Sequence, residues 1–131
     1  MTKGVFRLIP GLRVHDAAVT SVRLGQSSAI EFRRLDGSCV RLAMSGCSEF
    51  GTIGFRSSAI VSTVQVFSLA DHLEEVPIAG WRTLVGDDFI PSADEISALS
   101  RTARLLVSIS CSYGGELAVM CDSVAVEELA S

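Results

Sequence analysis

The sequence lacks a long apolar run. Its two most apolar stretches, residues 59–69 and 105–111, are interrupted by serine, threonine or glutamine, and they fall far short of the roughly 18 to 20 apolar residues that a membrane-spanning helix needs. Its first residues, Met-Thr-Lys-Gly-Val-Phe-Arg, also lack the continuous apolar segment of a secretory signal. We therefore expect no membrane span and no export by that route, which indicates a cytoplasmic location.

The sequence also lacks the ligand spacing of a metal site. It has no Cys-x-x-Cys pair, and its histidines lie far from its cysteines along the chain. The cysteines are Cys39, Cys47, Cys111 and Cys121, and the histidines are His15 and His72. Four cysteines are enough for two disulfides, but in a reducing compartment we expect buried free thiols instead. Neither a metal nor a cofactor is predicted.

Apolar residues are nevertheless plentiful, at 48% of a chain of 131 residues. A chain of this length buries about two-thirds of its unfolded surface, which is enough for an independent core. It contains no internal repeat and no linker rich in proline, glycine and serine. These features predict one folded domain over residues 1–131.

The charges are unevenly distributed. Residues 1–66 carry a net charge of +4 and residues 67–131 a net charge of −8. Such segregation either marks a partner surface or places complementary edges of one fold beside each other, and we favour the second. The arginines on predicted strands are Arg23, Arg33, Arg34 and Arg41. Because no aromatic residues are interleaved with them and the chain is acidic overall, we expect solvated strand faces and no nucleic-acid partner.

Short runs of alternating apolar and polar residues predict β-strands over most of the chain. These runs cover residues 5–9, 18–24, 29–34, 39–44, 50–55, 60–69, 105–111 and 117–121. Residues 71–76 can form one helical turn, and residues 80–91 are predicted as a loop. Ser92 and Glu95 have the spacing of a capping box, which predicts a short helix that ends near Ser100. The predicted fold class is mainly β, bordering on α+β: an antiparallel meander forming a barrel or sandwich with one or two short helices.

The register of the first predicted hairpin follows from its apolar faces. Its buried residues are even-numbered on both strands, so matching faces require a loop with an odd number of residues. A three-residue loop, Leu35-Asp36-Gly37, pairs Phe32 with Val40 and Ile30 with Leu42.

The last predicted hairpin can be treated in the same way. A three-residue loop at Tyr113-Gly114-Gly115 pairs Cys111 with Leu117 and Val107 with Cys121. In that register Cys111 and Cys121 share a face but stand too far apart along the ladder for a disulfide, which needs a Cα separation of about 5.5 Å.

Three segments contain side chains that could take part in catalysis or bind a metal ion. His15 is next to Asp16, but adjacent residues in an extended chain point to opposite faces, so we expect a turn capped by Asp16 and a local hydrogen bond from His15. Cys47 lies near a hydroxyl and a carboxylate, yet no histidine is close in sequence to activate it, which favours a core thiol. The acids near Asp87 do not follow the ligand spacing of a calcium loop. We therefore predict no catalytic residue.

Binding residues can still be named from exposure and composition. Tyr113, in a glycine-rich hairpin loop, offers a large apolar ring and a hydroxyl group at low entropic cost. The predicted loop over residues 80–91 combines an aromatic residue with acids. The candidate binding residues are Trp81, Asp87, Asp88, Tyr113, His15 and Asp16.

Four signals occur in a suggestive order along the chain. They are His15-Asp16-Ala17 before a strand, Gly46-Cys47-x-x-Phe50, the long strand over residues 60–69, and Ser112-Tyr113-Gly114-Gly115-Glu116-Leu117 before a closing strand. In this order the chain resembles small uncharacterised bacterial β-rich proteins, some of which are similar to the immunity proteins of polymorphic toxin systems. The resemblance implies a stoichiometric binding protein with no chemistry of its own.

The leading hypothesis is therefore a non-enzymatic protein-interaction module of a bacterial cytoplasm, of the immunity type, that binds a toxin domain. One alternative is a β-barrel that binds a small ligand in an interior lined by Phe32, Val64 and Ile109. Another is a cysteine-dependent enzyme that uses Cys47 and His15. Exposed strand edges in a meander also permit a homodimer through edge pairing.

Overall fold

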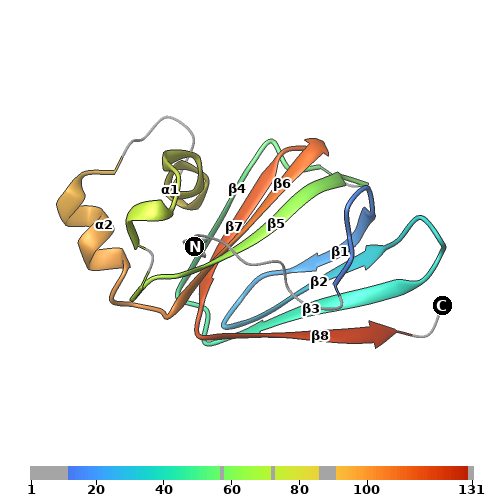
Figure 1. The fold of residues 1–131 in the computed structure, drawn as a ribbon, viewed down its shortest axis with the longest axis horizontal. Coiled ribbons are helices and arrows are strands. Elements are labelled where there is room, and N and C mark those ends of the chain that lie inside the picture. Colours follow the sequence, from blue (N-terminus) through green and yellow to red (C-terminus); the bar gives the residue numbers. More distant parts are fainter. Residues whose placement is uncertain (1–11, 57, 72, 86–90, 130–131) are drawn as a thin grey trace, which may run out of the picture.

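The computed structural model describes residues 12–56, 58–71, 73–85 and 91–129, which form eight β-strands and two α-helices (Figure 1). The strands are β1 (Ala18–Arg23), β2 (Ser27–Arg33), β3 (Cys39–Ser45), β4 (Glu49–Ile53), β5 (Ile60–Ser68), β6 (Leu105–Tyr113), β7 (Glu116–Cys121) and β8 (Ser123–Leu129). The helices are α1 (Ile78–Val85) and α2 (Ala93–Leu99), preceded by a 3-10 turn, Leu73–Glu75. The mainly β prediction is confirmed. The strand predicted over residues 5–9 lies outside the described residues.

All eight strands belong to one antiparallel sheet in the order β4-β7-β6-β5-β1-β2-β3-β8. The sheet is not closed into a barrel, because β4 and β8 are its two edges. Instead it folds over on itself, so that the half made of β1, β2, β3 and β8 faces the half made of β4 to β7 (Figure 1). α1 covers the outer face of the second half, and α2 lies beside α1 further from the sheet (Figure 1). Of the two predicted forms, the layered one describes this arrangement.

Two connections carry the chain from one half to the other at the same corner. β3 continues into β4 and β7 continues into β8, and the two bends lie side by side. The Asp122 amide donates to the Ser45 carbonyl at 2.9 Å, and the Ser48 amide donates to the Met120 carbonyl at 3.0 Å. Gly46 has a φ of +65°, and a Cβ atom there would lie 2.6 Å from Oδ2 of Asp122. The bend therefore requires glycine at this position.

The larger core cluster fills the space between the two halves. On the first half it contains Ile30 and Phe32 of β2 with Val40 and Leu42 of β3, all fully buried. β2 and β3 pair Phe32 with Val40 and Ile30 with Leu42, which confirms the predicted register. The Gly37 amide bonds to the Arg34 carbonyl, and the φ of Gly37 is +89°, so the three-residue loop is confirmed as well.

The predicted register of β6 and β7 is wrong by two residues. The strands pair Ile109 with Leu117 and Val107 with Val119, not Cys111 with Leu117 or Val107 with Cys121. The Cys111 amide donates to the Gly115 carbonyl at 3.1 Å, so the loop spans residues 112–114. A shift of two residues keeps every side chain on the same face of the sheet, so Val107, Ile109 and Leu117 still face the larger core cluster.

The cause of this shift is the close approach of two backbones. Both Gly114 and Gly115 have positive φ values, so either could end the loop. A Cβ atom on Gly115 would collide with the Ile53 carbonyl oxygen, where β4 ends beside β7, and one on Gly114 would lie 2.7 Å from Cβ of Ala59. Gly115 is thus needed for its contact with the end of β4, and Gly114 for its contact with the residue before β5. Nothing in the local sequence distinguishes these two roles.

Residues 78–85 form α1, where the sequence predicted a loop from residue 80. Trp81 and Leu84 are buried, and together with Leu106, Ala118 and Met120 they form the smaller core cluster on the outer face of the sheet. Burial of this aromatic ring outweighs the cost of a glycine inside a short helix, about 1 kcal/mol. The helix was missed because eight residues are too few for a clear period of 3.6.

The other short elements match the sequence more closely. The Ser92 hydroxyl accepts from the Glu95 amide, and the Glu95 carboxylate accepts from the Ser92 amide at 2.8 Å, so the capping box of α2 is confirmed.

β8 was not predicted. Only Asp122 separates it from β7, and because the chain changes layer there without reversing direction, no turn signal marks the boundary.

Gly51 of β4 provides a test of the contact between α1 and the sheet. A Cβ atom there would lie 2.3 Å from the Thr83 carbonyl and 2.6 Å from the Leu84 carbonyl. We expect Gly51→Ala to lower the free energy of unfolding by about 2 kcal/mol, because backbone atoms of α1 must move away. Gly25→Ala is the control, since its nearest neighbour is 3.8 Å away and a change within about 0.5 kcal/mol is expected. Urea unfolding of both variants measures this, and equal losses would contradict the close contact.

Candidate protein interface

Three of the six predicted binding residues gather around the first residues of β5. On one edge of β5 the Asp16 amide donates to the Val61 carbonyl at 2.8 Å, and His15 donates from Nδ1 to the Ser62 carbonyl at 2.8 Å. On the other edge Tyr113 is paired with Ile60. The two groups therefore lie on opposite sides of β5, with their backbones separated by two strand spacings, about 10 Å, in addition to any offset along the strands. We call His15, Asp16, Arg56 and Tyr113 the β5 end surface.

Tyr113 is the most prominent member of this surface. Its side chain is 54% exposed, although it is a large aromatic residue. The guanidinium carbon of Arg56 lies 5.5 Å from the centre of the ring, and Nη1 of Arg56 donates to the phenol oxygen at 3.3 Å. These contacts restrict both side chains before any partner arrives, which lowers the entropic cost of binding. Arg56 was not predicted, because 57 residues separate it from Tyr113 and no local pattern links them.

His15 and Asp16 are closer to each other than the sequence predicted. Nε2 of His15 lies 3.6 Å from Oδ2 of Asp16, and both side chains are largely exposed. Asp16 has a φ of +65°, so the chain is not extended there and the rule of opposite faces does not apply. The hydrogen bond of His15 was expected to be local, whereas it reaches Ser62 on β5. The pair therefore helps to attach the chain to β5 and leaves Nε2 on the surface.

A hollow of about 410 Å³ lies beside this surface, and Arg56 belongs to both. We call it the edge hollow. Its lining comprises Ala18, Val19, Thr20, Ser21 and Val22 of β1, Arg33 of β2, and Phe55, Arg56 and Ser58 of the connection from β4 to β5. The two arginines are the charged residues of this lining.

The other predicted binding residues do not join the β5 end surface. Trp81 is only 2% exposed and lies in the smaller core cluster under α1, so its indole does not reach the surface. Asp87 and Asp88 lie outside the described residues. An acidic surface in this part of the chain would thus have to form without the tryptophan.

Cys47 and His15 are at opposite ends of the folded sheet. Cys47 lies at the corner near Cys121, which pairs with Leu105 at the first residue of β6. His15 lies near Val61, which pairs with Cys111 towards the other end of β6. Six residues of strand separate Leu105 from Cys111, which corresponds to about 20 Å. All four cysteines are free, as expected, but only Cys121 is buried, whereas Cys39, Cys47 and Cys111 are half-buried. Burial raises the pKa of Cys121 to about 12.

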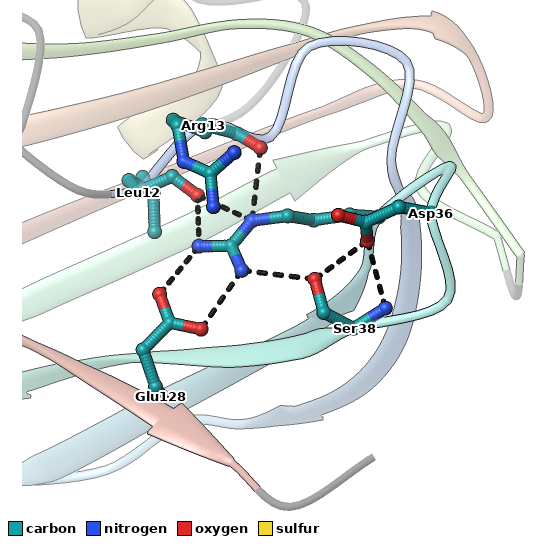
Figure 2. A network of polar contacts seen from close by, with 6 residues as sticks. Leu12, Arg13, Asp36, Ser38 and Glu128 are labelled. Atoms are coloured by element: carbon teal, nitrogen blue, oxygen red, sulfur yellow. Dashed lines mark hydrogen bonds and ion pairs between the residues drawn. The ribbon is translucent and has the colours of Figure 1, made fainter.

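The end of the folded sheet where His15 lies also contains a buried arginine, Arg34, which connects three segments of the chain (Figure 2). Arg34 is 6% exposed, and its guanidinium group donates to the carbonyls of Leu12 and Arg13, to the Ser38 hydroxyl and to both carboxylate oxygens of Glu128. The two bonds to Glu128 are 2.8 and 2.7 Å long. Because carbonyls and a carboxylate already occupy its donors, Arg34 connects β8 to the chain before β1 and is not available to a ligand.

A second arginine shows how the uneven charge distribution is resolved. Arg41 on β3 bonds to Glu31 on β2 at 2.9 Å and to Glu127 on β8 at 2.9 Å. With the pair of Arg34 and Glu128, bases from the first half of the sequence thus lie beside acids from the second half. These two pairs have the arrangement expected for complementary edges of one fold, while Arg41 also pairs with an acid of the first half.

Neither the scan against protein-family models nor the searches of curated proteins and of solved structures found a match to this chain. Within residues 12–129, the described parts contain no group of three or more histidine, cysteine, aspartate or glutamate side chains placed to hold a metal ion. No helix in the described segments is long and apolar enough to cross a bilayer.

Thiol reactivity tests the placement of the cysteines. At pH 8 a thiol with a pKa of about 12 is ionised in roughly one molecule in ten thousand, so Cys121 is expected to resist iodoacetamide until the protein unfolds. Peptide mapping by mass spectrometry identifies the modified residues, with the chain in urea as the control. Rapid labelling of Cys121, or labelling of Cys47 faster in the folded than in the unfolded chain, would contradict this account.

The pair of Arg34 and Glu128 predicts a defined pH dependence. The hydrogen bonds from Arg34 lower the pKa of Glu128, so its stabilising contribution is present above the pKa of the unfolded chain, about 4.3, and is lost as the pH falls through the folded value. We expect Glu128→Gln to be less stable than the parent at pH 7, with a difference that shrinks below pH about 4. The exposed Glu74→Gln is the control. Urea unfolding at several pH values measures both, and a constant difference would exclude the linkage.

Proposed function

We propose that this chain is a non-enzymatic protein-interaction module and that the β5 end surface contacts its partner. The observation that carries the proposal is Tyr113, exposed over half its area and held in place by Arg56. Tyrosine and arginine are the residues that most often dominate the binding energy of protein interfaces, together with tryptophan. The neighbouring pair of His15 and Asp16 adds polar groups of the kind that form the rim of such an interface.

The immunity type of this function rests on the resemblance of the motifs, two of which contribute to the β5 end surface. His15 and Asp16 come from the first motif and Tyr113 from the last. We propose a toxin domain as the partner and the bacterial cytoplasm as the location, which is compatible with four free cysteines. A homodimer through the outer edge of β8 is a further proposal, since β3 is the only described strand that pairs with β8.

The alternative functions have less support. Phe32, Val64 and Ile109, the proposed lining of a ligand-binding barrel, are buried against one another and their neighbours in the larger core cluster. None of these three residues lines the edge hollow or the hollow of about 340 Å³ beside β2, β3 and β8. A cysteine-dependent enzyme would need a base close to Cys47, and His15 lies at the other end of the sheet.

Coexpression with a toxin domain, sought among the proteins encoded beside this one, tests the proposal. We expect a stoichiometric complex and protection of the host, and we expect Tyr113→Ala or Arg56→Ala to weaken the complex at least tenfold, or about 1.4 kcal/mol. Calorimetry of the purified proteins measures this. Ile78→Ala and Arg104→Ala are matched controls, because they remove an exposed apolar residue and an exposed arginine elsewhere.

Two results would contradict the proposal in different ways. If no complex forms and no protection is seen, the immunity function is wrong. If a complex forms with an affinity that Tyr113→Ala and Arg56→Ala leave unchanged, the interaction function stands but the β5 end surface is not the contact.

A further inference from the structure

β1 is paired along only one of its edges for most of its length. It meets β5 at a single residue pair, Ala18 with Ile60. Beside that pair the Val19 amide donates to the Ala59 carbonyl at 2.8 Å, and the Val61 amide donates to the Ala17 carbonyl at 2.9 Å. Beyond Val19 the two strands separate, and the rest of β1 has a described strand neighbour only in β2.

The register of β1 places backbone groups on the open edge. The pairing of β1 with β2 shifts between Val19 and Ser21, which marks Thr20 as the extra residue of a β-bulge. After the bulge, the N–H and C=O groups of Ser21 and Arg23 point to β2. Because successive residues of a strand direct these groups to alternate sides, those of Val22 point to the open edge. This edge can accept an added strand in the manner of known peptide-binding sheets.

The edge hollow runs along this part of β1 and has one sign of charge. Val22 of β1 and Phe55 of the facing connection provide apolar area, and Arg33 and Arg56 provide the charges. The lining contains no aspartate or glutamate, although the chain as a whole has a net charge of −4. Within the described residues Arg33 has neither an ion pair nor a side-chain hydrogen bond, in contrast to Arg34 and Arg41. Its charge is therefore available to an anionic group.

The second surface hollow does not share these features. It lies on the outer face of β1, β2, β3 and β8, and its lining includes Arg41 and Glu127, which already bond to each other. It includes residues of β8, which is an edge strand, but its lining contains the acid Glu127 and so does not have a single sign of charge. The edge hollow is thus the better complement to an acidic chain.

We propose that the edge hollow binds an extended segment of the partner protein that carries an acidic side chain. The segment adds to β1 beside Val22, its apolar residues contact Phe55, and its carboxylate binds Arg33 and Arg56. This inference rests on the proposed interaction function and specifies the partner's chemistry. It also explains the position of the hollow next to the β5 end surface, because Arg56 contributes to both.

Two capped pentapeptides of equal length test the proposal directly, Thr-Glu-Val-Glu-Thr and Thr-Lys-Val-Lys-Thr. We expect the acidic peptide to shift the amide resonance of Val22 and the Nε–H resonances of Arg33 and Arg56 in the isotope-labelled full chain. The Arg33→Ala/Arg56→Ala variant is expected to bind the acidic peptide at least tenfold more weakly. Arg101→Ala/Arg104→Ala, which removes the same charge near α2, is the matched control and should bind it normally.

Each other outcome overturns the proposal in a recognisable way. Equal binding of both peptides, or no binding at millimolar concentration, shows that the hollow does not select acidic segments. If acetate or inorganic phosphate alone produces the same shifts at the same concentration, the hollow binds anions and not an extended chain. A toxin domain that binds through Tyr113 while the acidic peptide does not bind would refute this inference and leave the proposed function intact.

Discussion

The fold depends on the corner at which β3 continues into β4 and β7 into β8. The two halves of the sheet are joined in its plane by the short pairing of β1 with β5 and along the chain by two connections, and the strands on either side of these connections are hydrogen-bonded to each other, β3 to β8 and β7 to β4. Gly46 permits the bend, and the Asp122 amide fixes it to Ser45. The larger core cluster exists because this ribbon brings the inner faces of the two halves together.

The opposite end of the folded sheet is held by charge instead of covalent continuity. Arg34 connects the chain before β1, the loop between β2 and β3, and the edge strand β8. A buried guanidinium group is costly unless its donors are paired, and here carbonyls, a hydroxyl and a carboxylate surround it. Part of the charge asymmetry of the sequence is thus used inside the fold, whereas Arg33 and Arg56 have no ion pair among the described residues.

The sequence predicted what is local and missed what depends on distant contacts. The hairpin of β2 and β3 has one glycine and unambiguous faces, so its register followed from the pattern alone. The hairpin of β6 and β7 has two glycines with positive φ, and both contact distant residues, Gly114 meeting Ala59 and Gly115 the end of β4. α1 and β8 were missed for a similar reason, since burial against β6 and β7 defines the first and pairing with β3 the second. In each case the deciding neighbour is dozens of residues away.

The candidate interface has the same origin. Tyr113, His15 and Asp16 could be singled out one by one, but only the pairing of β5 with segments from both ends of the chain brings them together and adds Arg56. The geometry that assembles this surface also opens the edge of β1. The pairing of β1 with β5 ends after Val19, and after the bulge at Thr20 the backbone groups of Val22 have no partner strand among the described residues. The folding of one sheet into two layers therefore produces both the β5 end surface and the open edge of β1 beside it.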